Sequence, residues 1–214
     1  KAGAEVKCRA SVNELSHRAN HWQIRAGGEA LQARIIVNAA GAWADHVAEL
    51  AGVQRLGLTP FRRTIAQVRL DQALSADLPL TIHIGGDFYF KPESGGQLWL
   101  SPHDETPSPP CDAAPEEFDI ALALDRFSQV LEHKIEAVTH SWAGLRTFSP
   151  DRLPVYGFDP QGPGFFWCAG QGGFGIQTAP AAARLCAATI LGQNHDANLR
   201  EIEPALYSPA RFRR

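Results

Sequence analysis

Residues 165–178 have the pattern best suited to hold an anionic or electron-rich ligand group. Phe165–Ala169 is a short apolar and aromatic run, which predicts a buried strand, and an Ala-rich segment over 176–191 predicts a helix. Between them lie Gly170, Gly172, Gly173 and Gly175. Glycine lets the backbone approach a ligand closely, and the helix start offers N–H groups at the positive end of its dipole. A tightly packed turn without a ligand has the same pattern, so both interpretations stay open.

A cation stands upstream of this turn. Arg146 is the one cation in the second half of a predicted strand over 138–147. A guanidinium binds a carboxylate through two parallel, charge-assisted hydrogen bonds. We therefore expect Arg146 to bind a carboxylate.

A second strand and turn precede these elements. Ile35, Ile36 and Val37 predict a buried parallel strand, and the small residues at 39–42 let the backbone pass close to another group. A helix is predicted to follow to about Ala51, where Gly52 stops it. Taken alone, this is also an ordinary strand, turn and helix.

These segments together resemble a known family. The runs WAGLRTF at 142–148, GFFW at 164–167 and QGGFGIQT at 171–178 are similar to the C-terminal signature of the FAD-dependent D-amino-acid oxidase (DAO) superfamily, closest to its D-arginine and D-amino-acid dehydrogenase branch. The run NAAGAW at 38–43 resembles a second FAD-contacting motif of that superfamily. The resemblance implies an FAD cofactor held by Ala40, Gly41, Trp43, Gly170, Gly172, Gly173, Gly175, Ile176, Gln177 and Thr178.

The resemblance also implies a substrate site. Arg146 and Tyr89, the latter within FYFKP at 88–92, would be its catalytic residues, and Gly173 would also touch the substrate. Arg62 or Arg63 would supply a second carboxylate-binding guanidinium, and the sequence does not say which. The alternatives are a sheet tyrosine with a solvated hydroxyl and two exposed arginines.

The pattern of elements predicts an α/β (α+β) fold: part of a Rossmann-like FAD-binding domain over 1–56 and 141–214, and an antiparallel-sheet substrate domain over 57–140. Strands are predicted at 5–12, 22–25 and 32–37, with polar turns at 13–20 and 27–28. In the substrate domain we expect strands at 64–70 and 81–84 and a hairpin of 87–92 with 97–101.

The rest of that domain is predicted to be a loop and a helix. Five prolines over 101–115 exclude a regular element, and His103, Asp104 and Glu105 read as solvated loop residues rather than metal ligands. From Glu116, a helix is expected whose apolar face consists of Ile120, Leu124, Phe127, Leu131 and Ile135.

Composition excludes several classes of function. The net charge of −3 and the pI near 6.2 offer no basic field for nucleic acid. The four cysteines lack metal-ligand spacing and read as reduced thiols. No apolar run approaches the length of a membrane span, so a cytoplasmic location is expected.

The sequence has no Met, and no GxGxxG fingerprint follows its first predicted strand, where a Rossmann-type FAD domain carries it. We therefore expect the later part of a larger flavoprotein. Its predicted activity is hydride transfer from an amino acid, D-configured by the resemblance, to flavin N5, giving an imino acid and then a 2-oxo acid, with a quinone, a dye or oxygen as the final electron acceptor. Two alternatives stay open: a related enzyme for a 2-hydroxy acid, glycine, sarcosine or glycerol 3-phosphate, and a non-catalytic fragment.

Overall fold

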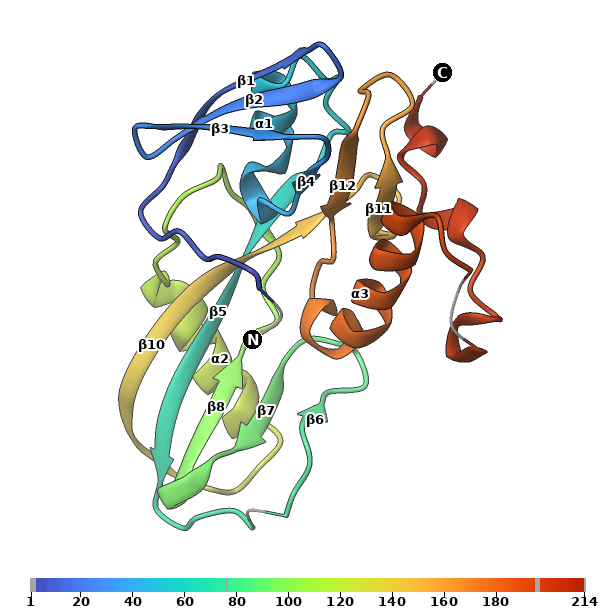
Figure 1. The fold of residues 1–214 in the computed structure, drawn as a ribbon. Helices are drawn as coiled ribbons and strands as arrows, with labels where there is room; N and C mark the ends of the chain where they lie inside the picture. The colour runs from blue at the N-terminus through green and yellow to red at the C-terminus, as the bar shows by residue number, and fades with distance from the viewer. Residues whose placement is uncertain (1–2, 76, 195–196, 214) are drawn as a thin grey trace. The chain divides into compact units, whose positions relative to one another are not determined.

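The computed structural model describes residues 3–75, 77–194 and 197–213, and the chain divides into two compact units, Lys1–Thr59 with Thr147–Arg214, and Pro60–Arg146. Figure 1 traces the chain through both. The architecture is mixed α/β with antiparallel sheets, as the sequence predicts. Across the described ranges, no helix is both long and apolar enough to cross a membrane.

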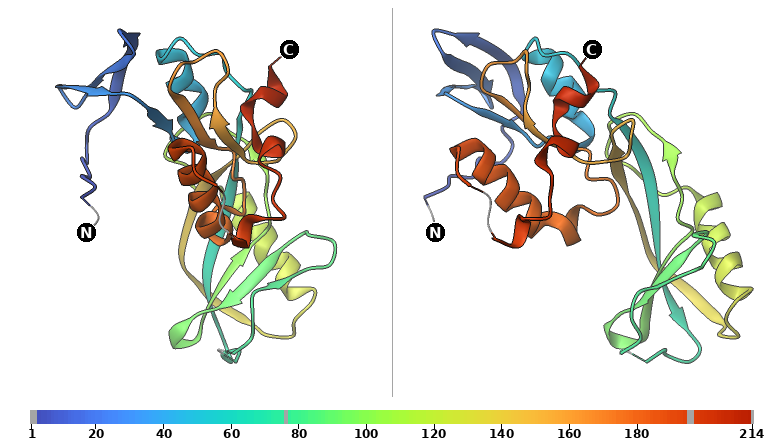
Figure 2. Two further views of the ribbon diagram at one scale, coloured as in Figure 1. Left: turned by 45° about the vertical axis from the view of Figure 1, so that its right-hand side comes forward. Right: turned by 90° about the vertical axis from the view of Figure 1, so that its right-hand side faces the viewer.

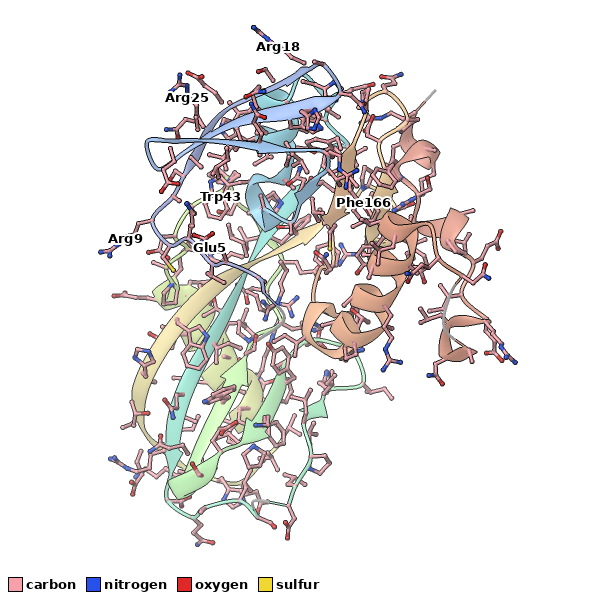
Figure 3. The ribbon with its side chains drawn as sticks, viewed as in Figure 1. Glu5, Arg9, Arg18, Arg25, Trp43 and Phe166 are labelled. Carbon is pink, nitrogen blue, oxygen red and sulfur yellow. The ribbon has the colours of Figure 1, made fainter. Side chains whose placement is uncertain are left out.

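The first unit begins with an antiparallel meander, β1 (Val12–Arg18), β2 (His21–Ala26) and β3 (Glu29–Ala33). The predicted turn at 13–20 is wrong, because β1 occupies most of it and pairs with β2 from Val12 to Arg18. Only Leu15 of β1 is buried, so the strand has no alternating apolar pattern to detect. The turn is instead the pair Ala19 and Asn20, both at positive φ. Arg18 and Arg25 extend outward from this hairpin (Figure 3).

The same unit contains a second sheet, with strand order β11-β12-β4. The predicted strand at 32–37 is two elements, because β3 ends at Ala33 and β4 (Ile36–Asn38) belongs to this second sheet. Strand β12 (Phe165–Ala169) pairs in parallel with β4 and antiparallel with β11 (Val155–Phe158). The predicted parallel strand is confirmed, but it is not fully buried: Val37 is 47% exposed because β4 is at the sheet edge.

Helices follow both parallel strands. A 3-10 turn, η1 (Gly41–Trp43), leads from β4 into α1 (Ala44–Leu50), and α3 (Gly175–Leu191) follows β12. Gly52 and Gly192 follow the two helices at positive φ, as predicted. The tail continues through the short 3-10 turns η3 (Ala197–Leu199), η4 (Pro204–Tyr207) and η5 (Pro209–Phe212).

The second unit is built on a sheet of order β10-β5-β8-β7-β6, with β9 also paired to β5. Its strands are β5 (Thr59–Leu70), β6 (Thr81–Ile82), β7 (Tyr89–Pro92), β8 (Gln97–Ser101), β9 (Thr106–Pro107) and β10 (Ile135–Phe148). The hairpin of β7 and β8 is confirmed; its turn contains the 3-10 segment η2 (Ser94–Gly96). Helix α2 (Glu117–Ser128) lies along one face of the sheet (Figure 2).

The predicted extent of α2 is wrong at its C-terminal end. The helix ends at Ser128, and Ile135 is the first residue of β10. Leu131 and Ile135 nevertheless pack against the same core as Phe127, a cluster with Phe90, Leu98 and Leu100. The helical spacing of the apolar residues therefore marked burial in one core rather than a continuous helix.

Candidate functional site

The parallel pair β4 and β12 places two turns side by side. Ile36, Val37 and Asn38 lie opposite Phe165, Phe166 and Trp167. Because the two strands are parallel, their carboxyl ends lie at the same end of the sheet. The turn with Ala40 and Gly41 and the turn with the four glycines both leave from that end, where open α/β sheets bind ligands.

The first turn is held by a buried amide. Asn38 is 2% exposed, its Nδ2 donates to the carbonyl of Ala44 at 2.8 Å, and its Oδ1 accepts from the amide of Ala40 at 3.3 Å. Gly41 follows at φ 56°, and a Cβ there would have no neighbour within 4 Å. Asn38 therefore positions the turn without being part of its exposed surface, a role that sequence reasoning missed.

Asp45, on the first turn of α1, fixes the chain that follows the helix. Its Oδ1 accepts from the amide of Leu56 at 3.0 Å, and its Oδ2 accepts from the amides of Gly57 and Leu58 at 3.0 and 2.9 Å. No motif in the sequence indicated this residue. Its carboxylate ties the loop after α1 to the start of the same helix.

The second turn is shaped by Phe148. The amide of Gly172 donates to the carbonyl of Thr147 at 2.9 Å, and Gly172 has φ 56°. A Cβ at Gly172 would lie 2.2 Å from the Phe148 ring, whereas one at Gly173 would have nothing within 4 Å. Gly172 is thus required by the fold, and Gly173 leaves an open approach to the backbone.

Helix α3 presents an uncapped N-terminus beside this turn. The amides of Gly175, Ile176 and Gln177 have no intrahelical acceptor, as in the first turn of any α-helix. No side chain caps them, and no acidic residue lies in the first turn. This end of the helix therefore keeps its full preference for an anion.

Exposed apolar side chains lie within or directly after the two turns. Ile176 is 95% exposed, Phe174 60% and Trp43 45% (Figure 3 labels Trp43). A flat ligand with an apolar ring and a polar, electron-rich edge matches this combination of exposed apolar side chains and free N–H groups. The residues present therefore fit a flavin: Ala40, Gly41 and Trp43 from the first turn, and the glycines with Ile176, Gln177 and Thr178 from the second.

In the second unit, Arg146 lies near the end of β10. Its side chain is half-buried and, counting only residues that the structure describes, it has no ion-pair or hydrogen-bond partner. Tyr89, in β7, is also half-buried, and its ring meets His103 edge-on with 5.5 Å between ring centroids. Strands β5 and β8 separate β10 from β7. Three strand spacings amount to about 14 Å in a flat sheet, so Arg146 and Tyr89 are not adjacent in it.

Arg62 and Arg63 are not exposed, because acidic partners hold both of them. Arg62 pairs with Glu116, and its Nη2 lies 2.8 Å from Asp119 Oδ2. The hydrogen bond that Arg62 donates to Glu116 is the largest influence on its pKa and raises it, although burial opposes the charge. Arg63 is 6% exposed and donates to the carbonyl of Asp104 at 2.8 Å and to Glu105 at 3.2 Å. Both guanidiniums therefore already have partners within the second unit.

The prediction of a solvated loop at 103–105 is wrong for Asp104. Its carboxylate is 6% exposed and accepts from both the amide and the hydroxyl of Thr64, at 2.7 and 3.0 Å. His103 contacts the carbonyl of Gly86 through Nδ1. The loop is thus fastened to β5. Within the described ranges, no three His, Cys, Asp or Glu side chains are grouped to hold a metal ion.

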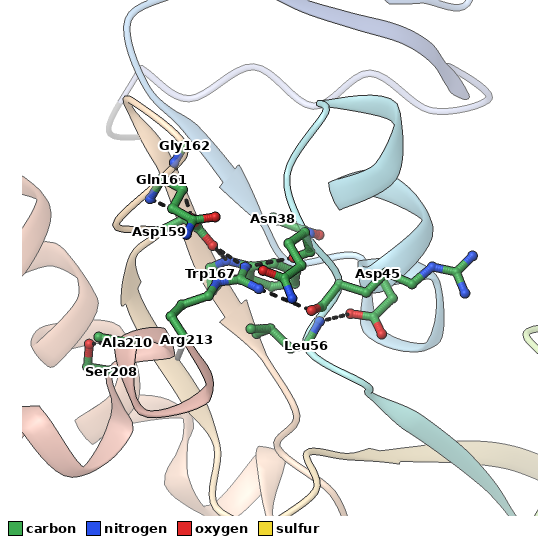
Figure 4. Close-up of polar contacts among 12 residues, drawn as sticks. Asn38, Asp45, Leu56, Asp159, Gln161, Gly162, Trp167, Ser208, Ala210 and Arg213 are labelled. Atoms are coloured by element: carbon green, nitrogen blue, oxygen red, sulfur yellow. Dashed lines mark hydrogen bonds and ion pairs between the residues drawn. The ribbon is translucent and has the colours of Figure 1, made fainter.

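The C-terminal segment is bound to the rest of the first unit by a buried ion pair between Arg213 and Asp159. Asp159 accepts from Arg213, from Trp167 Nε1 at 3.0 Å and from the amides of Gln161 and Gly162 (Figure 4). Burial raises the pKa of Asp159, but the hydrogen bonds from Arg213 and Trp167 outweigh burial and lower it. Trp167, opposite Asn38, is therefore fixed by Asp159, whose carboxylate the tail residue Arg213 also binds.

A second tail arginine holds the loop after Phe148. Arg211 Nε and Nη2 bind Asp151 Oδ2 and Oδ1 at 2.7 and 3.1 Å. The hydrogen bond from Arg211 is the main reason that the pKa of Asp151 falls from 3.8 to about 2. The two tail arginines, neither of them indicated by the sequence, hold the loops next to β11 and β12.

Known proteins resemble this chain in sequence and in fold. FAD-dependent oxidoreductase domain-containing protein 1 of Xenopus laevis is 27% identical over 200 residues, which cover 86% of this chain and 39% of that protein. Human mitochondrial dimethylglycine dehydrogenase is 28% identical over 231 residues, covering 97% of this chain and 26% of that protein. The crystal structure of glycine oxidase from Geobacillus kaustophilus superposes with a TM-score of 0.78 at 23% identity, covering 94% of this chain and 52% of that one.

The chain thus spans 26% to 52% of the length of these proteins. One family model, described as FAD dependent oxidoreductase, matches residues 1–189, which is most of the chain. The chain belongs to the FAD-dependent oxidoreductase family, whose cofactor is FAD.

Proposed function

We propose that the protein containing this chain oxidises the C–N bond of an amino acid with FAD. The first unit would be its cofactor domain and the second its substrate domain. The observation that supports this proposal most is the pairing of two glycine-bearing turns at the aligned ends of β4 and β12, next to an uncapped helix. The relatives named for glycine oxidation and dimethylglycine dehydrogenation support an amine substrate.

The N–H groups at the start of α3 would act on the cofactor's electron-rich edge. FAD, when bound, supplies a two-electron acceptor for a hydride. The fixed amide dipoles of Gly175–Gln177 would stabilise negative charge that develops near them, and such preorganised groups contribute about 3 kcal/mol in measured cases. Gly173, having no side chain, would leave the approach to these amides free.

Arg146 would bind the substrate carboxylate and so orient Cα. It is half-buried and without a partner among the described residues, whereas Arg62 and Arg63 are already paired. The Tyr89 hydroxyl would donate a hydrogen bond to a different part of the substrate, because two strands separate Tyr89 from Arg146 in the sheet. Loss of a hydride from Cα of the neutral amine gives an imino acid, which water converts into a 2-oxo acid and ammonia. No general base is assigned.

Two substrate classes remain to be distinguished. The resemblance of the WAGLRTF and QGGFGIQT runs to the D-arginine dehydrogenase branch favours a D-amino acid such as D-arginine. The names of two similar proteins, glycine oxidase and dimethylglycine dehydrogenase, favour glycine or an N-methylated glycine as the second candidate. Both classes carry the carboxylate that Arg146 would bind.

The decisive experiment is an absorbance spectrum of the purified chain before and after addition of FAD. Retained flavin bands that bleach anaerobically with D-arginine support the first class, and bleaching with glycine or dimethylglycine supports the second. Oxygen uptake compared with dye or quinone reduction then identifies the electron acceptor. A chain that retains no FAD, even at micromolar excess of the free cofactor, contradicts the assignment of the two turns in this chain.

The role of Arg146 is tested by Arg146→Met in the same assay. We expect FAD retention to be unchanged and the substrate concentration for half-maximal bleaching to rise by at least about a hundredfold, as for loss of a charged hydrogen-bonded pair. Arg69→Met, which removes an exposed cation from the same unit, is the matched control. Equal bleaching by both variants would remove Arg146 from the site.

A further inference from the structure

Two cysteines on the elements that flank the glycine turn pack in one apolar cluster. Cys168 lies in β12, two residues before Gly170, and Cys186 lies in α3. Both pack in the apolar cluster of Tyr156, Phe166, Leu185 and Leu199, and Cys186 is 7% exposed. Cys168 packs against this cluster from β12, and Cys186 belongs to it from α3, so both thiols share one apolar environment. Strand and helix thus each contribute one thiol to the cluster, with Cys186 buried and Cys168 half-buried.

The surroundings of the pair make the two thiols unequal. Gln171 Nε2 lies 3.6 Å from the sulfur of Cys168 and can donate to it. The hydrogen bond from Cys186 is the main reason that the pKa of Cys168 falls to about 7, while the same contact and burial raise the pKa of Cys186. Tyr156, opposite Cys168 in β11, stays a neutral phenol, because burial raises its pKa to about 12.

This combination is unlike that of the other two cysteines. Cys8 and Cys111 are exposed, and each lies far from any other cysteine in the sequence. A thiolate beside a protonated thiol is the arrangement that reacts with an oxidant and then resolves to a disulfide. An inert buried cysteine needs neither a partner thiol nor an amide donor.

We propose that Cys168 and Cys186 are a redox-active pair that a peroxide converts into a disulfide joining strand β12 to helix α3. This modification site is independent of the proposed flavin chemistry, since the pair lies entirely within the first unit and needs no bound cofactor.

The reaction takes place in two balanced steps. The Cys168 thiolate attacks a peroxide oxygen of hydrogen peroxide, the O–O bond breaks, and with one proton the products are a sulfenic acid and water. The Cys186 sulfur then attacks the Cys168 sulfur, the S–O bond breaks, and the hydroxyl leaves as water with the Cys186 proton. Overall, two thiols lose two electrons and two protons, and one peroxide becomes two waters.

The disulfide would close a covalent loop around the glycine turn. Cys168 precedes Gly170 and Cys186 lies beyond Gly175, so the turn and the first half of α3 are inside the loop. Cross-linking the ends of a segment removes its more open conformations. Oxidation is therefore expected to restrict local opening of the turn, and reduction to release it.

The test uses the chain with Cys8→Ser and Cys111→Ser, which removes the two exposed thiols. After hydrogen peroxide treatment and alkylation under denaturing conditions, non-reducing peptide mapping should find one linked peptide containing Cys168 and Cys186. Adding Cys186→Ser should replace the link with a sulfenic acid at Cys168 that dimedone traps, and adding Cys168→Ser should abolish both products. Hydrogen exchange of the amides at 170–175 should slow at least about tenfold on oxidation.

The same peptide mapping is also done on the unsubstituted chain, so that the test does not depend on the folding of any variant. Recovery of both Cys168 and Cys186 as alkylated thiols, under peroxide that fully oxidises a reference dithiol peptide, overturns the proposal. So does a link that forms only between separate chains. Oxidation without any change in exchange at 170–175 contradicts the restriction of the turn.

Discussion

Asn38 and Trp167 lie opposite each other across the parallel pair β4 and β12, and each is held by a contact outside the pair. The amide of Asn38 is bonded to Ala44 and Ala40, and the indole of Trp167 is bonded to Asp159. Both residues are essentially fully buried. They fix the point at which the two glycine-bearing turns leave the sheet together.

Asn38→Ala should destabilise the first unit and disturb its first turn. The change leaves the carbonyl of Ala44 and the amide of Ala40 without their partners, and such losses cost about 1 to 3 kcal/mol. Urea unfolding should show this decrease in the free energy of unfolding. Asn13→Ala, at an exposed position in β1, is the control and should be nearly neutral. Equal stability of both variants would mean that the amide does not hold the turn.

Valine at position 172 should affect folding stability, whereas valine at position 173 should affect FAD binding. Gly172→Val places a side chain against the Phe148 ring at a positive φ and should cost about 3 kcal/mol of folding free energy. Gly173→Val meets no protein atom and should change stability by less than about 0.5 kcal/mol. Its side chain would, however, cover the approach to the turn, so FAD retention should fall. A Gly173→Val chain that binds FAD as tightly as the parent argues against a ligand at this turn.

Removing Arg62 should lower the folding stability of the chain, whereas removing Arg146 should not. Arg62→Met leaves Asp119 without its cation in a nearly buried position, which should cost about 2 kcal/mol. Arg146→Met removes no hydrogen bond or ion pair within the described residues and should leave the free energy of unfolding nearly unchanged. Thermal unfolding of the two variants beside the parent chain measures this. A large loss of stability in Arg146→Met would point to a structural role instead.

The Asp151–Arg211 pair should make stability depend on pH in the acid range. The pKa of Asp151 is lowered from 3.8 to about 2 in the folded chain. The contribution of the pair is therefore complete above the unfolded value of 3.8 and is lost as the pH falls towards about 2. The difference in unfolding free energy between the parent and Asp151→Asn should be larger at about pH 6 than at about pH 2. Asp112→Asn, at an exposed position, should show a much smaller change.

The local pattern of the sequence determined the strands, glycine turns and helices at 35–51 and 165–192 and the hairpin of 89–92 with 97–101. These features depend on neighbours along the chain: a positive φ favours glycine, and an apolar run before a glycine cluster predicts a strand before a turn. The family resemblance rests on the same local runs. That is why the cofactor class could be inferred without a structure.

Tertiary structure decided which polar side chains are available for ligands. Arg62 and Arg63 looked like candidates until carboxylates more than 40 residues away in the sequence were seen to hold them. Asp104 looked solvated until it was found bonded to Thr64. Leu131 and Ile135 matched a helical period but lie beyond the helix. Pairing and burial depend on contacts between distant segments, which residue spacing does not encode, so only the folded chain revealed them.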